Sequence, residues 1–127
     1  MDSLDAKVRD FAELLRLGRP LEAMERYYAP EISVFENRRL ARAGKQQCLQ
    51  HEREALASQP DPPRFRLGSL AVNQATGHAF LEYVVRFRSA EGRPARLEEV
   101  AVQTWEEGLI VQERFYYEGV VDEGDEA

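Results

Sequence analysis

The stretch EEVAVQTWEEGLIVQERFYYEG, residues 98–119, decides the fold of this chain. Two runs rich in Val, Ile and aromatic residues flank the Glu-Glu-Gly of residues 106–108. This pattern is typical of two β-strands joined by a tight turn with a bulge at the glycine. A three-residue loop places Trp105 opposite Leu109 and Gln103 opposite Val111. The segment therefore predicts a β-hairpin with a defined pairing.

The predicted pairing gathers polar side chains among aromatic ones. Side chains alternate between the two faces of a strand, so one face carries Leu97, Glu99, Ala101, Gln103, Trp105, Leu109, Val111, Glu113, Phe115 and Tyr117. Burying a carboxylate without partners is costly, so the polar groups of this face either satisfy one another or line a wet cavity. We assign this face to the helices, and we predict a pocket lined by Glu99, Ala101, Gln103, Trp105, Glu113, Phe115 and Tyr117.

The opposite face of the hairpin holds Glu98, Gln112 and Arg114 and is otherwise mainly apolar. It carries Val100, Val102, Thr104, Ile110 and Tyr116. A contiguous patch of this kind is rarely left wholly in water, and a self-complementary patch pairs most often about a two-fold axis. We therefore expect a homodimer through the outer face of the sheet.

The rest of the chain supplies helices first and strands afterwards. Apolar residues recur at helical spacing from Leu4 to Leu15, and Pro20 suits the first turn of a second helix that reaches Tyr28. A short β-prone run follows at residues 32–36, and a third helix spans residues 45–57. Four more β-prone runs, at residues 65–72, 78–89, 96–105 and 109–119, are separated by turn sequences. This order predicts an α+β fold with three N-terminal helices packed into an antiparallel sheet.

The third helix carries an acid inside its apolar stripe. Cys48, Leu49 and Leu56 lie about one helical turn apart, Glu52 falls between them, and His51 lies at the edge of the stripe. The helical repeat of this segment and the two-residue repeat of the hairpin strands are independent patterns. Both place acids on the side of the predicted cavity. We expect Glu52 to face the cavity; the alternative is an ion pair between Glu52 and an arginine of the sheet.

The composition is that of a single water-soluble domain. The chain has 127 residues and a net charge of −6, and its apolar fraction of 43% is ordinary for a globular protein. We place the domain at residues 1–119 and an acidic, disordered tail at residues 120–127. The charged start, the absence of a long apolar run and the single cysteine, Cys48, predict a cytoplasmic protein that does not enter a membrane. The scattered arginines do not favour nucleic-acid binding, and we interpret Arg38, Arg39 and Arg42 as a solvated loop.

Two segments together resemble a known family. LLRLGRPLEAMERYYAPEISVFEN, residues 14–37, and VAVQTWEEGLIVQERFYY, residues 100–117, resemble in this order the SnoaL-like branch of the nuclear transport factor 2-like superfamily. The likeness covers almost the whole chain, and it implies a cone in which a strongly curved sheet wraps around the helices and leaves a mostly apolar pocket. Members include ketosteroid isomerase, polyketide cyclases, limonene epoxide hydrolase, dehydratases and non-catalytic binding domains. The fold therefore does not give the function.

The resemblance carries over one catalytic position of three. Ketosteroid isomerase has its general-base carboxylate at the end of the first strand, where this chain has Glu36. Phe11 stands where the isomerase has its oxyanion-hole tyrosine, and Ala101 stands where both the isomerase and the cyclases have an acid. The resemblance therefore implies Glu36 as a proton acceptor, but it implies neither the isomerase mechanism nor that of the cyclases.

The expected site combines four acids with an amide: Glu36, Glu52, Glu99, Gln103 and Glu113, with Tyr28, His51 and Trp105 nearby. Repulsion and partial burial should raise the pKa of at least one carboxyl group. Such a site suits acid–base chemistry of an isomerase, lyase or hydrolase on an unknown small organic molecule. His51 is a weaker candidate for proton transfer, and a cationic ligand over the face of Trp105 is a further reading.

The alternative to a functional pocket is a non-catalytic ligand-binding or dimerisation domain. In that case Arg86, Arg88 or Arg114 would hold the acids in structural ion pairs. The chain shows no paired His or Cys spacing of a metal site, so no metal or other cofactor is expected. Cys48 is interpreted as a small core residue.

Overall fold

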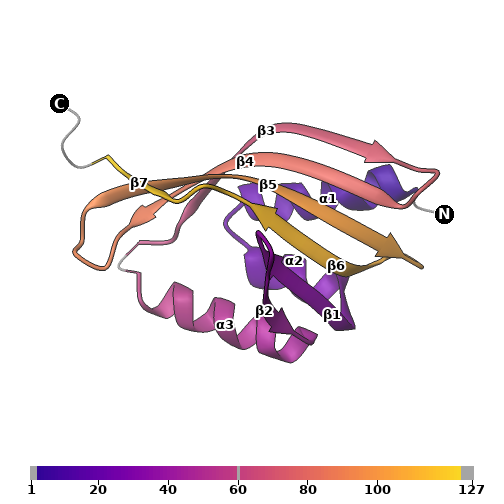
Figure 1. The fold of residues 1–127 in the computed structure, drawn as a ribbon, viewed down its shortest axis with the longest axis horizontal. Coiled ribbons are helices and arrows are strands. Elements are labelled where there is room, and N and C mark those ends of the chain that lie inside the picture. Colours follow the sequence, from indigo (N-terminus) through magenta and orange to yellow (C-terminus); the bar gives the residue numbers. More distant parts are fainter. Residues whose placement is uncertain (1–2, 60, 124–127) are drawn as a thin grey trace.

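The α+β class expected from the sequence is confirmed. A computed structural model describes residues 3–59 and 61–123. Its elements are α1 (Leu4–Arg16), α2 (Pro20–Tyr27), β1 (Tyr28–Glu36), β2 (Arg39–Ala43), α3 (Lys45–Ala57), β3 (Arg64–Asn73), β4 (His78–Arg88), β5 (Pro94–Glu106), β6 (Leu109–Tyr116) and β7 (Val120–Asp122) (Figure 1). None of the helices within these described residues is long and apolar enough to cross a membrane.

The helix boundaries follow local chemistry. Ser3 caps α1, because its side-chain oxygen accepts a hydrogen bond from the backbone N–H of Ala6 at 3.1 Å. Pro20 lies in the first turn of α2, where its missing N–H costs nothing. Tyr28 adopts an extended conformation, with φ −77° and ψ 131°, so it opens β1 and does not extend the helix as the sequence pattern suggested. The side chain of Tyr28 is thereby held by the sheet.

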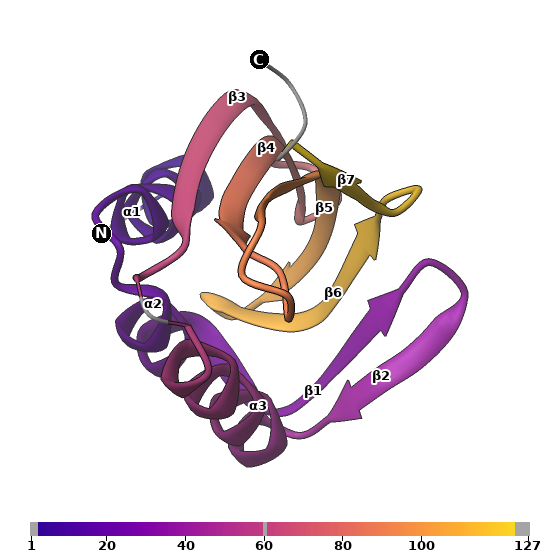
Figure 2. The same ribbon diagram turned by 90° about the vertical axis from the view of Figure 1, so that its left-hand side faces the viewer.

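The sheet is mixed, and in this respect the expectation of a wholly antiparallel sheet was wrong. The strand order is β2-β1-β6-β5-β4-β3, with β7 paired to β5. β1 and β6 run parallel, whereas all other strand pairs in the described residues are antiparallel. A parallel pair needs a long crossover, and here α3 and β3–β5 supply it. Figure 2 shows the strands curving around a concave side that the helices close.

Two strands were missing from the sequence interpretation. The segment with the clustered arginines is not a solvated loop, because Arg39–Ala43 forms β2 and pairs with β1. The third helix therefore follows two strands, whereas the sequence predicted one strand before it. Residues Val120–Asp122, which had been placed in the disordered tail, form β7. Residues 124–127 of that tail lie outside the described residues.

The β5–β6 hairpin differs from its prediction in its turn and in its register, but the two differences together leave most side chains on the predicted face. Its turn has two residues, Glu107 with φ 52° and Gly108 with φ 81°, as hairpin turns of the mirror-image type require. Trp105 consequently pairs with Ile110, and a register shift follows between Thr104 and Trp105. The shorter loop and the bulge each shift the pairing by one residue in the same direction. A shift of two residues leaves each side chain on its face, so Glu113 still faces the concave side. The pairings predicted for Trp105 and Gln103 were therefore wrong, although the inward face is largely retained.

Only the tip of this hairpin changes face. Ile110 was assigned to the outer surface, but its side chain is fully buried. It joins the core between the helices and the concave face of the sheet, which also contains Val8, Phe11, Ile32 and Leu81. Gln103, by contrast, now pairs directly with Glu113 across the two strands. This pairing brings the amide of Gln103 within hydrogen-bond distance of the carboxyl group of Glu113.

Candidate functional site

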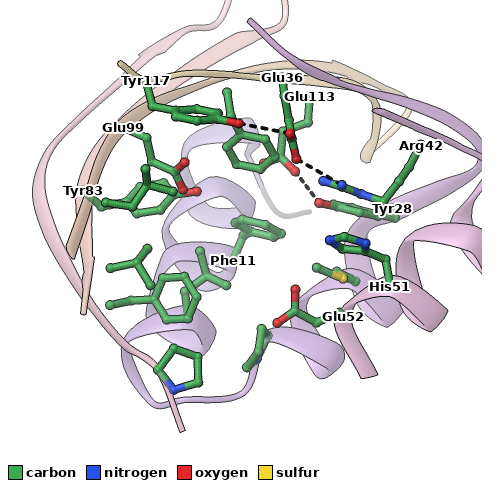
Figure 3. A pocket seen from close by; sticks show the side chains of 18 of the residues that line it. Phe11, Tyr28, Glu36, Arg42, His51, Glu52, Tyr83, Glu99, Glu113 and Tyr117 are labelled. Atoms are coloured by element: carbon green, nitrogen blue, oxygen red, sulfur yellow. Dashed lines mark hydrogen bonds and ion pairs between the residues drawn. The ribbon is translucent and has the colours of Figure 1, made fainter. Parts of the chain in front are cut away.

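A cavity of about 330 Å³ lies between the concave face of the sheet and the three helices. One part of its lining is apolar: Phe11, Leu15, Pro20, Met24, Pro63, Phe65, Val85, Leu97, Phe115 and Val120. The other part is polar: Tyr28, Glu36, Arg42, His51, Glu52, Tyr83, Glu99, Glu113 and Tyr117. Figure 3 shows Tyr83 and Glu99 on one side of this space and Tyr28, Arg42 and His51 on the other.

Most of the residues predicted from the sequence line this cavity. Tyr28, Glu36, His51, Glu52, Glu99, Glu113, Phe115 and Tyr117 do so. Ala101, Gln103 and Trp105 do not, because all three are buried behind the lining. The ring of Trp105 packs against that of Tyr27, with 5.4 Å between their centroids. A cationic ligand therefore does not reach the face of Trp105, and that reading was wrong.

Gln103 and Trp105 support the site from behind. The indole Nε1–H of Trp105 donates to Oε1 of Gln103 at 2.9 Å. The amide Nε2 of Gln103 donates to Oε2 of Glu113 at 2.8 Å, and the hydroxyl of Tyr28 donates to Oε1 of Glu113. These bonds form a continuous buried chain that ends at the cavity with Tyr28.

Glu113 is a buried carboxyl group without an ion pair. Its side chain is 1% exposed, and burial raises its pKa, while the hydrogen bonds from Gln103 and Tyr28 and the charge of Arg42 oppose that rise. Of the described arginines, none forms an ion pair with it. The carboxyl group is therefore held by neutral donors and not by a counter-ion.

Glu99 has the pKa of a group that exchanges protons near neutrality. Burial raises the pKa of Glu99 to about 7; the hydroxyl of Tyr83 donates to the carboxylate and opposes the rise, whereas the charges of Glu113 and Glu36 increase it. Glu99 lines the cavity. It therefore meets the main requirement for general acid–base chemistry, which is a pKa close to the working pH.

Glu36 lies in a different environment. Arg39 donates to its Oε1 at 2.8 Å, Arg42 to its Oε2 at 3.2 Å, and the hydroxyl of Tyr117 to Oε1 at 3.0 Å. Burial acts to raise the pKa of Glu36, but these bonds and the two positive charges outweigh it, so the pKa lies below its usual value. Both carboxylate oxygens are occupied, and the ionised form is favoured.

Helix α3 contributes two titratable groups to the cavity wall. Burial raises the pKa of Glu52, with the charge of Arg42 opposing the rise. Burial and the same charge lower the pKa of His51, so the imidazole is neutral at physiological pH. The sheet arginine whose charge acts on Glu52 is Arg42 of β2, and the two side chains do not form a direct ion pair in the described part of the chain.

The arginines proposed to neutralise the acids point elsewhere. Arg86 pairs with Glu123, Arg88 donates to the backbone oxygen of Gly92 at 3.1 Å, and Arg114 lies over the ring of Phe35 at 4.2 Å. The cation of the cavity is Arg42, whose side chain is 14% exposed. Sequence reasoning missed Arg42 because its orientation depends on the pairing of β2 with β1.

Tyr83 was also missed, although the sequence contained a signal for it. It alternates with Leu81 and Val85 along β4, and this period of two places all three on one face of the strand. Among residues 3–59 and 61–123, no group of three or more His, Cys, Asp and Glu side chains is arranged to hold a metal ion.

No family model and no curated protein matches this sequence. Solved structures do match it. A candidate SnoaL-like polyketide cyclase from Mesorhizobium loti is 25% identical, with a TM-score of 0.72, and the match covers 91% of this chain and 100% of that one. A candidate ketosteroid isomerase from Kribbella flavida is 15% identical, with a TM-score of 0.72, over 94% of this chain and 80% of that one.

An NTF2-like protein of unknown function from Cytophaga hutchinsonii has the same fold. It is 14% identical to this chain, with a TM-score of 0.74, and the match covers 91% of this chain and 100% of that one. The resemblance to the SnoaL-like, nuclear transport factor 2-like proteins is thereby confirmed. The chain has the curved-sheet fold of these proteins.

Proposed function

We propose that this protein binds a small, largely apolar organic molecule in the cavity and transfers a proton to or from it through Glu99. The observation that carries this proposal is the position of Glu99 on the wall of a largely apolar cavity. Burial there raises the pKa of Glu99 to about 7. A carboxyl group with this pKa is half protonated near neutral pH, so it both accepts and returns a proton. The isomerase and cyclase names of proteins with this fold support a small-molecule substrate.

Glu36, the proton acceptor implied by the family resemblance, receives a different role in this proposal. Its carboxylate is held by Arg39, Arg42 and Tyr117, and a carboxylate that accepts charge-assisted bonds is a weak base. We assign to Glu36 the task of orienting Arg42 and Tyr117 at the cavity wall. The neutral imidazole of His51 is a secondary acceptor for a polar group of the ligand.

The proposed reaction step is proton abstraction next to a carbonyl group. The Glu99 carboxylate takes a proton from the carbon beside the carbonyl, and the electron pair of the broken C–H bond moves to give an enolate. The protonated Glu99 then returns a proton to the same carbon or to another atom of the conjugated system. No cofactor is needed for this step, because no electron is lost or gained overall.

Exchange of hydrogen for deuterium tests this step without knowledge of the natural substrate. The probe is 1-tetralone, a bicyclic aryl ketone, in deuterated buffer, and NMR follows the loss of its protons beside the carbonyl. The protein should accelerate exchange, and the rate should rise with pH through about 7, because the ionised form of Glu99 is the base. In Glu99→Gln the rate of exchange catalysed by the protein should be at least about tenfold lower.

Glu98→Gln is the matched control for this experiment. Glu98 is the neighbouring residue of the same strand, its side chain is 60% exposed, and it bonds Arg96 on the opposite face. This variant should exchange at the parent rate. Equal rates for the parent and Glu99→Gln, or an equal loss in both variants, would contradict the role given to Glu99.

A non-catalytic role is the second candidate, and the ion pairs of Glu36 with Arg39 and Arg42 favour it. In that case 1-tetralone or a similar compound would raise the melting temperature of the protein without accelerated exchange.

We also propose a homodimer through the outer face of the sheet, where Phe80 lies directly opposite Val102 and is 41% exposed.

A further inference from the structure

Trp105 holds the side chain of Gln103 in one orientation. An indole N–H only donates hydrogen bonds, so the amide atom that faces it at 2.9 Å is the oxygen. The amide nitrogen is then directed to Oε2 of Glu113 at 2.8 Å. Gln103 is fully buried, and Glu113 is 1% exposed, so neither group turns to solvent for another partner. Oε2 of Glu113 is therefore always an acceptor.

This constraint determines where a proton on Glu113 resides. With Oε2 engaged by a donor, the acidic proton occupies Oε1, the oxygen that is bonded to the Tyr28 hydroxyl. When Glu113 is ionised, Tyr28 donates to Oε1 and presents only lone pairs to the cavity. When Glu113 is protonated, Oε1–H donates to the Tyr28 oxygen, and the hydroxyl proton of Tyr28 is free to turn to the cavity that Tyr28 lines.

We propose that the Trp105–Gln103–Glu113 chain makes Tyr28 a hydrogen-bond donor for a carbonyl oxygen of the ligand, and that such a ligand binds together with a proton on Glu113. The inference rests on the proposed function, because it concerns the molecule that occupies the same cavity. It adds the functional group that the ligand presents and the residue that recognises it. Gln103 and Trp105 are positioning residues in this arrangement, since they do not reach the cavity.

The groups around Tyr28 and Glu113 come from every element packed against them. They are Glu36 on β1, Arg42 on β2, Cys48, His51 and Glu52 on α3, Tyr83 on β4, Glu99 on β5 and Tyr117 after β6. Burial raises the pKa of Tyr28 far above its usual value, so this phenol stays neutral. Glu113 and Glu99 are the two carboxyl groups whose titration must be separated, because both lie near the bound ligand.

Proton uptake gives the binding a defined pH dependence. The ligand with a carbonyl oxygen favours protonated Glu113, so the affinity is highest below the pKa of Glu113. Above that pKa the affinity should fall to a plateau about tenfold lower, because the bound ligand loses the hydrogen bond from Tyr28. Titration of Glu99 would add a second pH dependence to the affinity. The affinity is therefore measured in a Glu99→Gln background, where residue 99 does not titrate.

The test uses 1-tetralone and the infrared stretch of its carbonyl group. In the Glu99→Gln background, the stretch of bound 1-tetralone should move to lower frequency at acidic pH, where Tyr28 donates, and return toward the free value at alkaline pH. Glu113→Gln should fix the donating state, because its amide oxygen accepts from Gln103 and its amide nitrogen donates to Tyr28. This variant should bind with a pH-independent affinity and keep the lowered frequency throughout.

Tyr28→Phe should bind about tenfold more weakly at acidic pH and show no lowered frequency. A lowered frequency in Tyr28→Phe, or the same pH dependence in Glu113→Gln as in its parent, would overturn the inference while leaving ligand binding intact. Absence of binding at every pH would contradict the proposed function itself. A ligand-free NMR titration is an independent check: the indole N–H signal of Trp105 should stay hydrogen-bonded throughout, and its loss would overturn the fixed orientation of Gln103.

Discussion

Four carboxyl groups line one cavity, and the surroundings of three of them, Glu36, Glu99 and Glu113, give these three different properties. Glu36 is held ionised by Arg39 and Arg42, Glu113 is buried among neutral donors, and Glu99 keeps contact with the cavity at a pKa of about 7. Separate environments for neighbouring acids are the usual way in which a site assigns separate roles to them. Glu99 is therefore the residue on which the proposed chemistry depends.

The raised pKa of Glu99 predicts a pH-dependent effect on stability. Its pKa is 4.5 in an unfolded chain and about 7 in the fold, so the folded protein binds the proton more tightly and loses stability as pH rises between these values. Glu99→Gln removes this loss. Relative to the parent, the variant should be similar near pH 5 and more stable above pH 7, by roughly 1–3 kcal/mol. Urea denaturation near pH 5 and above pH 7 measures the free energy of unfolding of both proteins. A difference between variant and parent that is the same at both pH values would contradict the prediction.

Replacement of Gln103 tests the buried chain behind the site. Gln103→Leu removes the acceptor of the Trp105 indole and one donor of Glu113, and each group left unsatisfied costs about 1–3 kcal/mol. The free energy of unfolding should fall by an amount in this range or above it. Gln112→Leu is the control, because Gln112 lies on the adjacent strand and on the other face of the sheet. Equal losses of stability in both variants would show that the buried hydrogen-bond chain contributes nothing to the stability.

The β5–β6 hairpin shows how much of an element the sequence predicts. Strand alternation predicted Glu99 and Glu113 on one face, and both line the cavity of the structure. The shorter turn and the bulge between Thr104 and Trp105 together shift the pairing by two residues, which leaves the faces unchanged. Local patterns did not identify that bulge. They also did not predict that Arg42 faces the cavity, because this orientation follows from the pairing of β2 with β1, and that pairing is a tertiary contact.

The turn of this hairpin contains a residue in an unfavourable conformation. Glu107 has φ 52°, a region that costs a residue with a Cβ roughly 1–2 kcal/mol relative to glycine. Glu107→Gly should therefore stabilise the protein by about 0.5–1 kcal/mol. Glu106→Gly, in the adjacent extended position of β5, should destabilise it by a similar amount. Thermal denaturation compares the two, and a loss of stability in Glu107→Gly would contradict this account of the turn.

At the scale of the whole molecule, the outer face of the sheet predicts self-association. Phe80 and Val102 are cross-strand neighbours on that face, and Tyr116 is 50% exposed nearby on β6. Light scattering at micromolar concentration should give the mass of a dimer. Phe80→Asp should give the mass of a monomer, because a charge opposite its own symmetry mate disfavours the contact. A monomer mass for the parent protein would contradict the dimer.

The cavity, its apolar walls and its proton-exchanging acid form a single functional arrangement in this account, with Glu99 at its centre. The most direct measurement is an NMR titration of the Glu99 side-chain carboxyl carbon, assigned by its absence in Glu99→Gln. The account predicts a midpoint near pH 7. A midpoint at the ordinary glutamate value of 4.5 would mean that Glu99 is fully ionised at neutral pH and would contradict its role as the proton-exchanging group.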